Sequence, residues 1–130
     1  PHTSANISTR TISKAGGKAT YRSAVKVTPN AHHAKCSVNC ESLMLDDLSR
    51  SDTLPVMDIQ GDEADIGHEA TIGRISEEAV FYLMCRGISE EEARAMIVRG
   101  FVEPIAKELP LEYAVEMNNL INIELEGTMG

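Results

Sequence analysis

The order of apolar and polar residues follows two periods, which change near residue 75. Between Ala19 and Thr28 every second residue is apolar or small, as at Tyr21 and Val25. The residues between them are mostly polar, as at Arg22 and Lys26. Side chains of a strand point alternately to the two faces of its sheet, so this period of two predicts a half-buried strand.

Further short extended segments follow this strand and are separated by polar turns. They are Ser37 to Leu45, Leu54 to Ile59, and Ala64 to Ile66. No segment of helical period connects them, which leaves two architectures, a β-sandwich or a stacked parallel β-helix. Small polar residues inside the predicted strands favour the β-helix.

After residue 75 the period becomes helical. Ser76 can cap the N-terminus of a first helix that ends at Gly87. Ser89 begins a second helix, with Glu92 at the three-residue spacing of a capping box. We expect Gly100 to end this second helix.

Two more helices are predicted in the last thirty residues. A short one covers Phe101 to Lys107, with Pro104 tolerated in its first turn. The last covers Leu111 to Leu125, preceded by Pro110 and closed by Gly127. The chain is therefore expected to be an α+β protein with a strand domain at 1–74 and a helical domain at 75–130.

Length and composition suit a globular protein. The 130 residues are 42% apolar and 25% charged, and no apolar run approaches the roughly 20 residues of a membrane span. The opening Pro1-His2-Thr3 carries no leader, and we expect it to lie inside a longer protein. Three cysteines are few for a secreted scaffold, which indicates a reducing, cytoplasmic location.

Charge is distributed unevenly. The net charge is −8, yet residues 1–40 contain six Lys or Arg and no Asp or Glu. An acidic protein is a poor general binder of nucleic acid. The basic first third is expected to face an acidic surface outside this chain or an anionic partner.

A dense group of potential metal ligands lies at His32, His33, Cys36 and Cys40. The group suggests zinc, but four residues of strand cover about 13 Å, too far for two sulfurs to share one ion. Two interpretations stay open, a zinc-stabilised β domain and two cysteines buried as small apolar residues.

The dipeptide His68-Glu69 is a second candidate for metal or acid–base chemistry. A zinc protease helix would need a second histidine at position 72, which is Ile72. On a strand, His68 and Glu69 would point to opposite faces. A pair formed by Cys40 and His68 is possible in space, although no sequence signature places the two together.

Several ordered motifs resemble the SufB/SufD family of the SUF iron–sulfur cluster assembly system. They are Thr20-Tyr21-Arg22, Val25-Lys26-Val27, Asn39-Cys40-Glu41-Ser42, His68-Glu69-Ala70-Thr71, Arg86-Gly87-Ile88-Ser89 and Glu108-Leu109-Pro110-Leu111-Glu112. The resemblance covers nearly the whole chain, and the last motif is similar to the ending of the SufB branch. The chain would be the C-terminal portion of such a protein.

The resemblance implies a fold and a set of partners. The fold would be the last coils of a right-handed parallel β-helix, followed by a helical domain that docks the SufC-type ATPase. The partners would also include a SufD-type paralogue and apo-proteins that accept the cluster. The chain would be a scaffold and no enzyme by itself.

The resemblance also implies site residues. Cys40 occupies the position of the cysteine proposed as a ligand of a transient iron–sulfur cluster, and Glu69 that of its acidic partner. His68 is the neighbouring site histidine. Thiolates are the preferred ligands of such clusters, and a carboxylate is a weaker partner that would ease release.

Two alternatives to the scaffold remain. The chain could be a pure interaction module with a buried, non-ligand Cys40, or the zinc-stabilised domain described above. A β-helix stabilises each coil by stacking, so we expect the strand half to self-associate through its open edge. Residues before about Thr11 are expected to be poorly ordered unless such pairing holds them.

Overall fold

The computed structural model describes residues 1–126 of the chain. They divide into two compact units, one of strands at Pro1–Arg74 and one of helices from Ile75 onward. The strand unit contains five strands of ten residues, β1 (Ser4–Ser13), β2 (Lys18–Val27), β3 (Lys35–Met44), β4 (Arg50–Ile59) and β5 (Asp65–Arg74).

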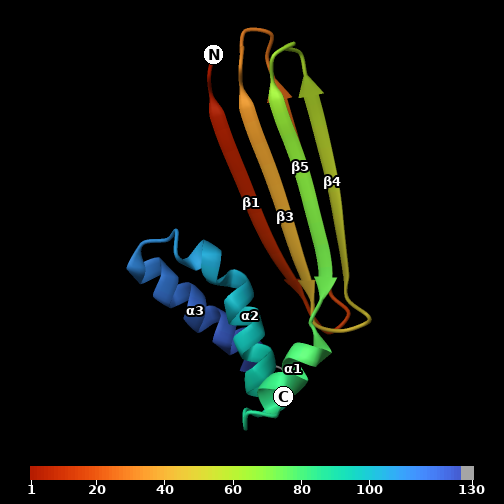
Figure 1. The fold of residues 1–130 in the computed structure, drawn as a ribbon, viewed down its shortest axis with the longest axis vertical. Helices are drawn as coiled ribbons and strands as arrows, with labels where there is room; N and C mark the ends of the chain where they lie inside the picture. The colour runs from red at the N-terminus through yellow and green to blue at the C-terminus, as the bar shows by residue number, and fades with distance from the viewer. Residues whose placement is uncertain (127–130) are drawn as a thin grey trace. The chain divides into compact units, whose positions relative to one another are not determined.

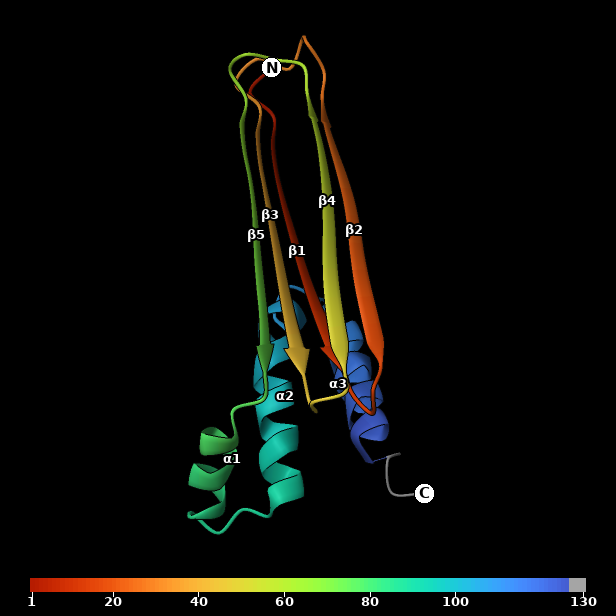
Figure 2. The ribbon, with the colours of Figure 1, turned by 90° about the vertical axis from the view of Figure 1, so that its right-hand side faces the viewer.

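The five strands form two parallel sheets. Strands β1, β3 and β5 lie side by side in one sheet (Figure 1), and β2 pairs with β4 in the other, as the turned view shows (Figure 2). Paired strands are offset by 31, 32 and 30 residues, as in Ser4 beside Lys35, Lys18 beside Arg50, and Lys35 beside Asp65. Each coil thus adds one strand to each sheet, which confirms the β-helix and excludes the antiparallel pairing typical of a sandwich.

Ser4–Ser13 form strand β1, which corrects the expectation that residues before about Thr11 are poorly ordered. It pairs with β3 over its whole length, and the Lys35 N–H donates to the Thr3 carbonyl at 2.8 Å. The sequence signal is weak because Ser4, Asn6 and Ser8 alternate with few apolar residues. The backbone ladder with the next coil supplies the order that side-chain alternation does not indicate.

The extended segment predicted at Leu54 to Ile59 is longer in the structure, because β4 already begins at Arg50. Pro55 lies in β4, which pairs with β2 on one side only within residues 1–126. Proline lacks an N–H to donate, and such residues are found on edge strands for that reason.

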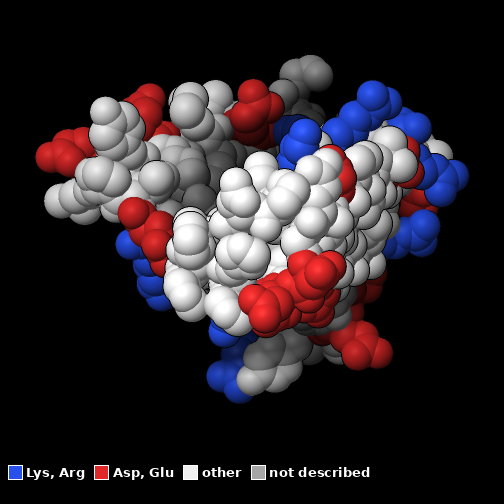
Figure 3. Space-filling view, turned by 90° about the horizontal axis from the view of Figure 1, so that it is seen from above, with Lys and Arg blue, Asp and Glu red and all other residues white. Residues whose placement is uncertain are grey.

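Three bases of the first coil, Arg10, Lys18 and Lys26, form ion pairs with acids of the next coil. Arg10 on β1 contacts Glu41 on β3 at 3.0 Å, and Lys18 on β2 contacts Asp52 on β4 at 2.9 Å. Their partners therefore lie in the same chain, which the charge distribution along the sequence did not reveal. Seen from above, blue and red groups border a broad uncharged area (Figure 3).

The interior between the two sheets is narrow and partly polar. On β3 the side chains of Val38, Cys40 and Ser42 are 1%, 2% and 7% exposed, respectively. They lie at alternate positions, as expected for the inward face of a strand. Ser13 and Ser49 are also buried, so the core contains hydroxyl groups as well as aliphatic side chains.

The helical unit contains α1 (Glu77–Met84), α2 (Glu90–Ala106) and α3 (Leu111–Glu126). The predicted caps are confirmed, because the hydroxyls of Ser76 and Ser89 accept hydrogen bonds from the N–H groups of Ala79 and Glu92, respectively. After α1, the N–H groups of Gly87 and Ile88 donate to Met84 and Leu83. Gly87 has φ +88°, so this turn is a Schellman motif that ends the helix.

The second and third predicted helices are one helix, α2, which corrects the prediction that Gly100 is a stop. A Cβ at position 100 would meet nothing within 4 Å, and the backbone there is right-handed helix. Pro104 also lies inside α2 and removes one backbone hydrogen bond. Burial of Ala93, Val98 and Ala106 along α2 outweighs these local penalties. The last predicted helix is confirmed, while Gly127 lies outside the described residues.

Candidate functional site

Cys40 and His68 form the candidate site of the strand unit. The Sγ atom of Cys40 lies 3.6 Å from Nε2 of His68, within reach of a sulfur hydrogen bond. Cys40 is buried and His68 is half-buried. A thiol beside an imidazole is the arrangement from which a thiolate forms most readily, as nucleophile or as metal ligand.

The coil repeat brings these two residues together. Strand β5 pairs with β3 so that Val38 lies beside His68 and Cys40 beside Ala70. His68 is thus the diagonal neighbour of Cys40 on the same, inward face, and its long side chain reaches the thiol.

Glu69 does not share this face. It lies beside Asn39 in the register and is exposed. Because successive side chains of a strand point to opposite faces, Glu69 projects from the outer face of the sheet. The structure therefore brings together two of the three residues named from the sequence, Cys40 and His68, and separates the third from them.

The histidines of the proposed zinc site lie in a turn before β3. His33 Nε2 contacts Glu63 at 3.2 Å, and its ring stacks on that of His2 with centroids 5.0 Å apart. Cys40 instead meets His68. No group of three His, Cys, Asp or Glu side chains within residues 1–126 is arranged to hold a metal ion.

A chain of hydroxyl groups beside Cys40 was not found from the sequence. The Ser42 hydroxyl lies 2.8 Å from that of Thr11 on β1 and 2.8 Å from that of Ser51 on β4. The only signal was the unusual density of serine and threonine inside strands, which indicated a β-helix but not which hydroxyls meet.

The inward face is less covered towards the last strands. Met57 and Ile59 on β4 and Ile72 on β5 belong to this face by register, yet they are 37%, 46% and 46% exposed. Large apolar side chains left exposed along the last strand of each sheet mark a face that another protein segment can cover.

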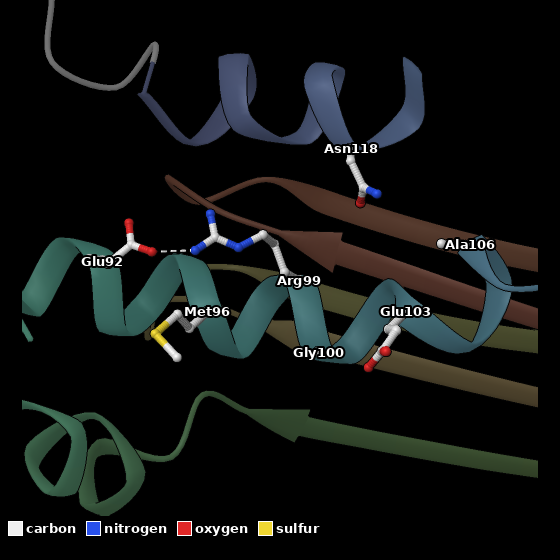
Figure 4. A pocket seen from close by; sticks show the side chains of 7 residues that line it. All are labelled: Glu92, Met96, Arg99, Gly100, Glu103, Ala106 and Asn118. Atoms are coloured by element: carbon white, nitrogen blue, oxygen red, sulfur yellow. Dashed lines mark hydrogen bonds and ion pairs between the residues drawn. The ribbon is translucent and has the colours of Figure 1, made fainter. Parts of the chain in front are cut away.

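The helical unit offers a second candidate surface. A groove of about 690 Å³ lies between α2 and α3, lined by Met96, Gly100, Glu103 and Ala106 of α2 and by Asn118 of α3, among others. Figure 4 shows that Arg99 points along the groove to Glu92, with which it forms an ion pair. Both carboxylates of the groove have cations of this chain as partners, since Glu103 contacts Lys107 at 2.7 Å.

One face of α3 carries exposed apolar side chains. Tyr113, Leu120 and Ile123 are 69%, 54% and 63% exposed. Their spacing of seven and three residues places them on one side of the helix. The adjacent side of the helix, with Ala114, Met117 and Ile121, is partly buried. The exposed stripe of Tyr113, Leu120 and Ile123 is therefore not needed to pack α3 on α2.

Comparison with known proteins gives a consistent match. The family described as SUF system FeS cluster assembly, SufBD core domain, matches residues 1–101. The iron–sulfur cluster assembly protein SufB of Bacillus subtilis is 52% identical over all 130 residues of this chain. SufBD family proteins of Mycobacterium tuberculosis and Staphylococcus aureus are likewise 52% identical.

The chain spans only part of these relatives. It covers 28% of the Bacillus subtilis and Staphylococcus aureus proteins and 15% of the Mycobacterium tuberculosis protein. Within residues 1–126, no helix combines the length and the hydropathy that a membrane crossing requires.

Proposed function

Because the chain belongs to the SufBD family of SUF-system iron–sulfur cluster assembly proteins, we propose that it supplies a thiolate ligand, Cys40, to a cluster under assembly. The cluster is cargo and not a resident cofactor. The observation that carries the proposal is the buried Cys40 thiol beside the His68 imidazole.

The chemistry of this pair suits a site that must bind and then release. A thiolate is the usual protein ligand of cluster iron, and imidazole replaces it in some clusters. Two ligands leave cluster irons with open positions, so other groups must complete the site. The exposed apolar residues Met57, Ile59 and Ile72 on the last strands support docking of a SufD-type paralogue against this face. That partner would supply the remaining ligands.

Glu69 has a separate place in this proposal. It occupies the position of the family's acidic partner, but it projects from the outer face while Cys40 and His68 project inward. Cys40 and His68 are the two proposed ligands that lie in contact on one face. Glu69 would reach the same cluster only if the last strand turned.

Anaerobic reconstitution with iron and sulfide tests the proposal. The chain should develop the visible charge-transfer absorption of an iron–sulfur cluster, and Cys40→Ala should lose it. Cys36→Ser is the matched control and should keep the absorption. Absorption that persists in Cys40→Ala would reject Cys40 as the ligand, and stoichiometric zinc without a cluster would favour the zinc-stabilised domain.

The helical unit supports a second proposed role, the docking of a SufC-type ATPase. The exposed stripe of Tyr113, Leu120 and Ile123 offers apolar anchors on a regular helix. Acidic side chains around it, such as Glu112 and Glu116, would speed encounter with a basic partner surface. Capture of the ATPase by immobilised chain tests this role. Equal capture by a chain that lacks residues 76–130 would reject it.

A further inference from the structure

The hydroxyls of Thr11, Ser42 and Ser51 form a chain of hydrogen bonds. The oxygens of Thr11 and Ser42 are 2.8 Å apart, and either hydroxyl can be the donor of this bond. The Thr11 hydroxyl also lies 3.4 Å from the main-chain carbonyl oxygen of Glu41. Ser51 in turn donates to Ser42 at 2.8 Å.

The chain of bonds ties three strands together at one point. Ser51 belongs to β4, Ser42 to β3 and Thr11 to β1, so the bonds cross the interior from one sheet to the other. Ser42 is the middle member and is 7% exposed. It alone of the three is bonded to both of the others, so removal of its hydroxyl breaks both links at once.

Ser42 lies two residues after Cys40 on the same inward face of β3. Between them, Glu41 is fixed at its carbonyl by Thr11 and at its carboxylate by Arg10, 3.0 Å away. Strand β3 is therefore pinned to β1 and β4 just after Cys40. On the side of β5, the Sγ of Cys40 faces His68 across 3.6 Å.

We propose that Ser42 is a positioning residue, whose hydroxyl holds β3 so that the Cys40 thiol stays within reach of His68. This inference rests on the proposed role of Cys40 for its meaning, but its geometry does not depend on iron. Ser42 acts on the thiol through the strand. A hydroxyl is required at this position, and a side chain of similar size without one does not replace it.

A double-mutant cycle tests the proposal in a Cys36→Ser, Cys85→Ser background, where Cys40 is the only thiol. The rate of Cys40 alkylation by iodoacetamide is measured for the parent, Ser42→Ala, His68→Gln and the double variant. If Ser42 maintains the pair, His68→Gln should change the alkylation rate at least about threefold less in the Ser42→Ala background than in the parent. Because Cys40 is 2% exposed, labelling through an unfolded state would also remove the effect of His68→Gln. The rates are therefore compared at urea concentrations below the unfolding transition of each variant, where added urea leaves them unchanged.

Three further variants make the result decisive. Ser42→Thr keeps the hydroxyl and should behave as the parent, and Ser37→Ala, on the outer face of β3, should have no coupling to His68. Thr11→Val, which keeps the shape of threonine, should reproduce part of the loss and replaces Ser42→Ala if that variant does not fold. Independent effects of Ser42 and His68 would overturn the proposal. The assay uses no cluster, so it stays separate from the reconstitution test of Cys40.

Discussion

Cys40 and His68 are 28 residues apart in the sequence, yet the Sγ of one lies 3.6 Å from Nε2 of the other. The pair forms across neighbouring strands of successive coils, on the face turned to the interior. Glu69, adjacent to His68 in sequence, is on the other face. The two neighbouring residues should therefore respond differently to the same substitution.

Substitution of His68 and of Glu69 by Gln should separate their roles. His68→Gln removes the imidazole that lies 3.6 Å from the Cys40 Sγ and should slow alkylation of Cys40 about two- to tenfold, the value of one hydrogen bond. Glu69→Gln should leave the rate nearly unchanged. The measurement is iodoacetamide labelling with Cys36 and Cys85 replaced by Ser. Equal slowing in both variants would contradict the two-face geometry.

Two glycines of the helical unit should respond to alanine with opposite signs. Gly87 has φ +88°, and Gly87→Ala should lower the free energy of unfolding by about 1–2 kcal/mol, because a Cβ disfavours this conformation. Gly100→Ala places a methyl group in free space inside α2 and should raise the free energy by about 0.5–1 kcal/mol. Urea denaturation followed by circular dichroism measures both. Destabilisation by Gly100→Ala would show that α2 needs glycine there.

Asp46 should contribute stability that depends on pH. Desolvation opposes its charge, but the Ser49 hydroxyl and the N–H groups of Ser49 and Leu48 donate to the carboxylate and lower the pKa of Asp46 below its ordinary 3.8. A lowered folded-state pKa gives stability that is present above about pH 4 and is lost as pH falls through the folded value.

Asp46→Ala should therefore lower the urea midpoint at pH 7, and the difference from the parent should shrink at pH 2–3. Asp47→Ala is the matched control in the same turn. Its carboxylate makes an exposed ion pair with Arg74 at 2.8 Å, and such pairs contribute little. A loss for Asp46→Ala that is as large at pH 2–3 as at pH 7 would show that the charge is irrelevant.

The exposed stripe on α3 should carry the affinity for the ATPase. Leu120→Ser and Ile123→Ser should each weaken capture roughly tenfold, since a few apolar anchors dominate most interfaces. Leu54→Ser is the matched control, because Leu54 is 49% exposed but lies in the strand unit. Circular dichroism checks that each variant folds. Unchanged capture by both α3 variants would move the docking surface elsewhere, for example to the groove beside Met96.

Local sequence determined the elements whose cause is local. The alternation around Tyr21 and Val25 predicts β2, and the serines at positions 76 and 89 predict two helix starts, because these signals act within a few residues of chain. The opposite faces of His68 and Glu69 also follow from strand geometry alone. The family motifs around Cys40 added the fold and the chemistry of the site.

Only the tertiary structure decided what depends on contacts between distant residues. Strand β1 is ordered by its ladder with β3, and α2 continues through Gly100 and Pro104 because burial outweighs their low propensity. The Cys40–His68 pair and the hydroxyl chain at Ser42 depend on a register set by coils of 30 to 32 residues. A slip of one residue in this register would turn the side chains of a whole strand to the other face, and no pattern within a single strand specifies which residues of the next coil it pairs with.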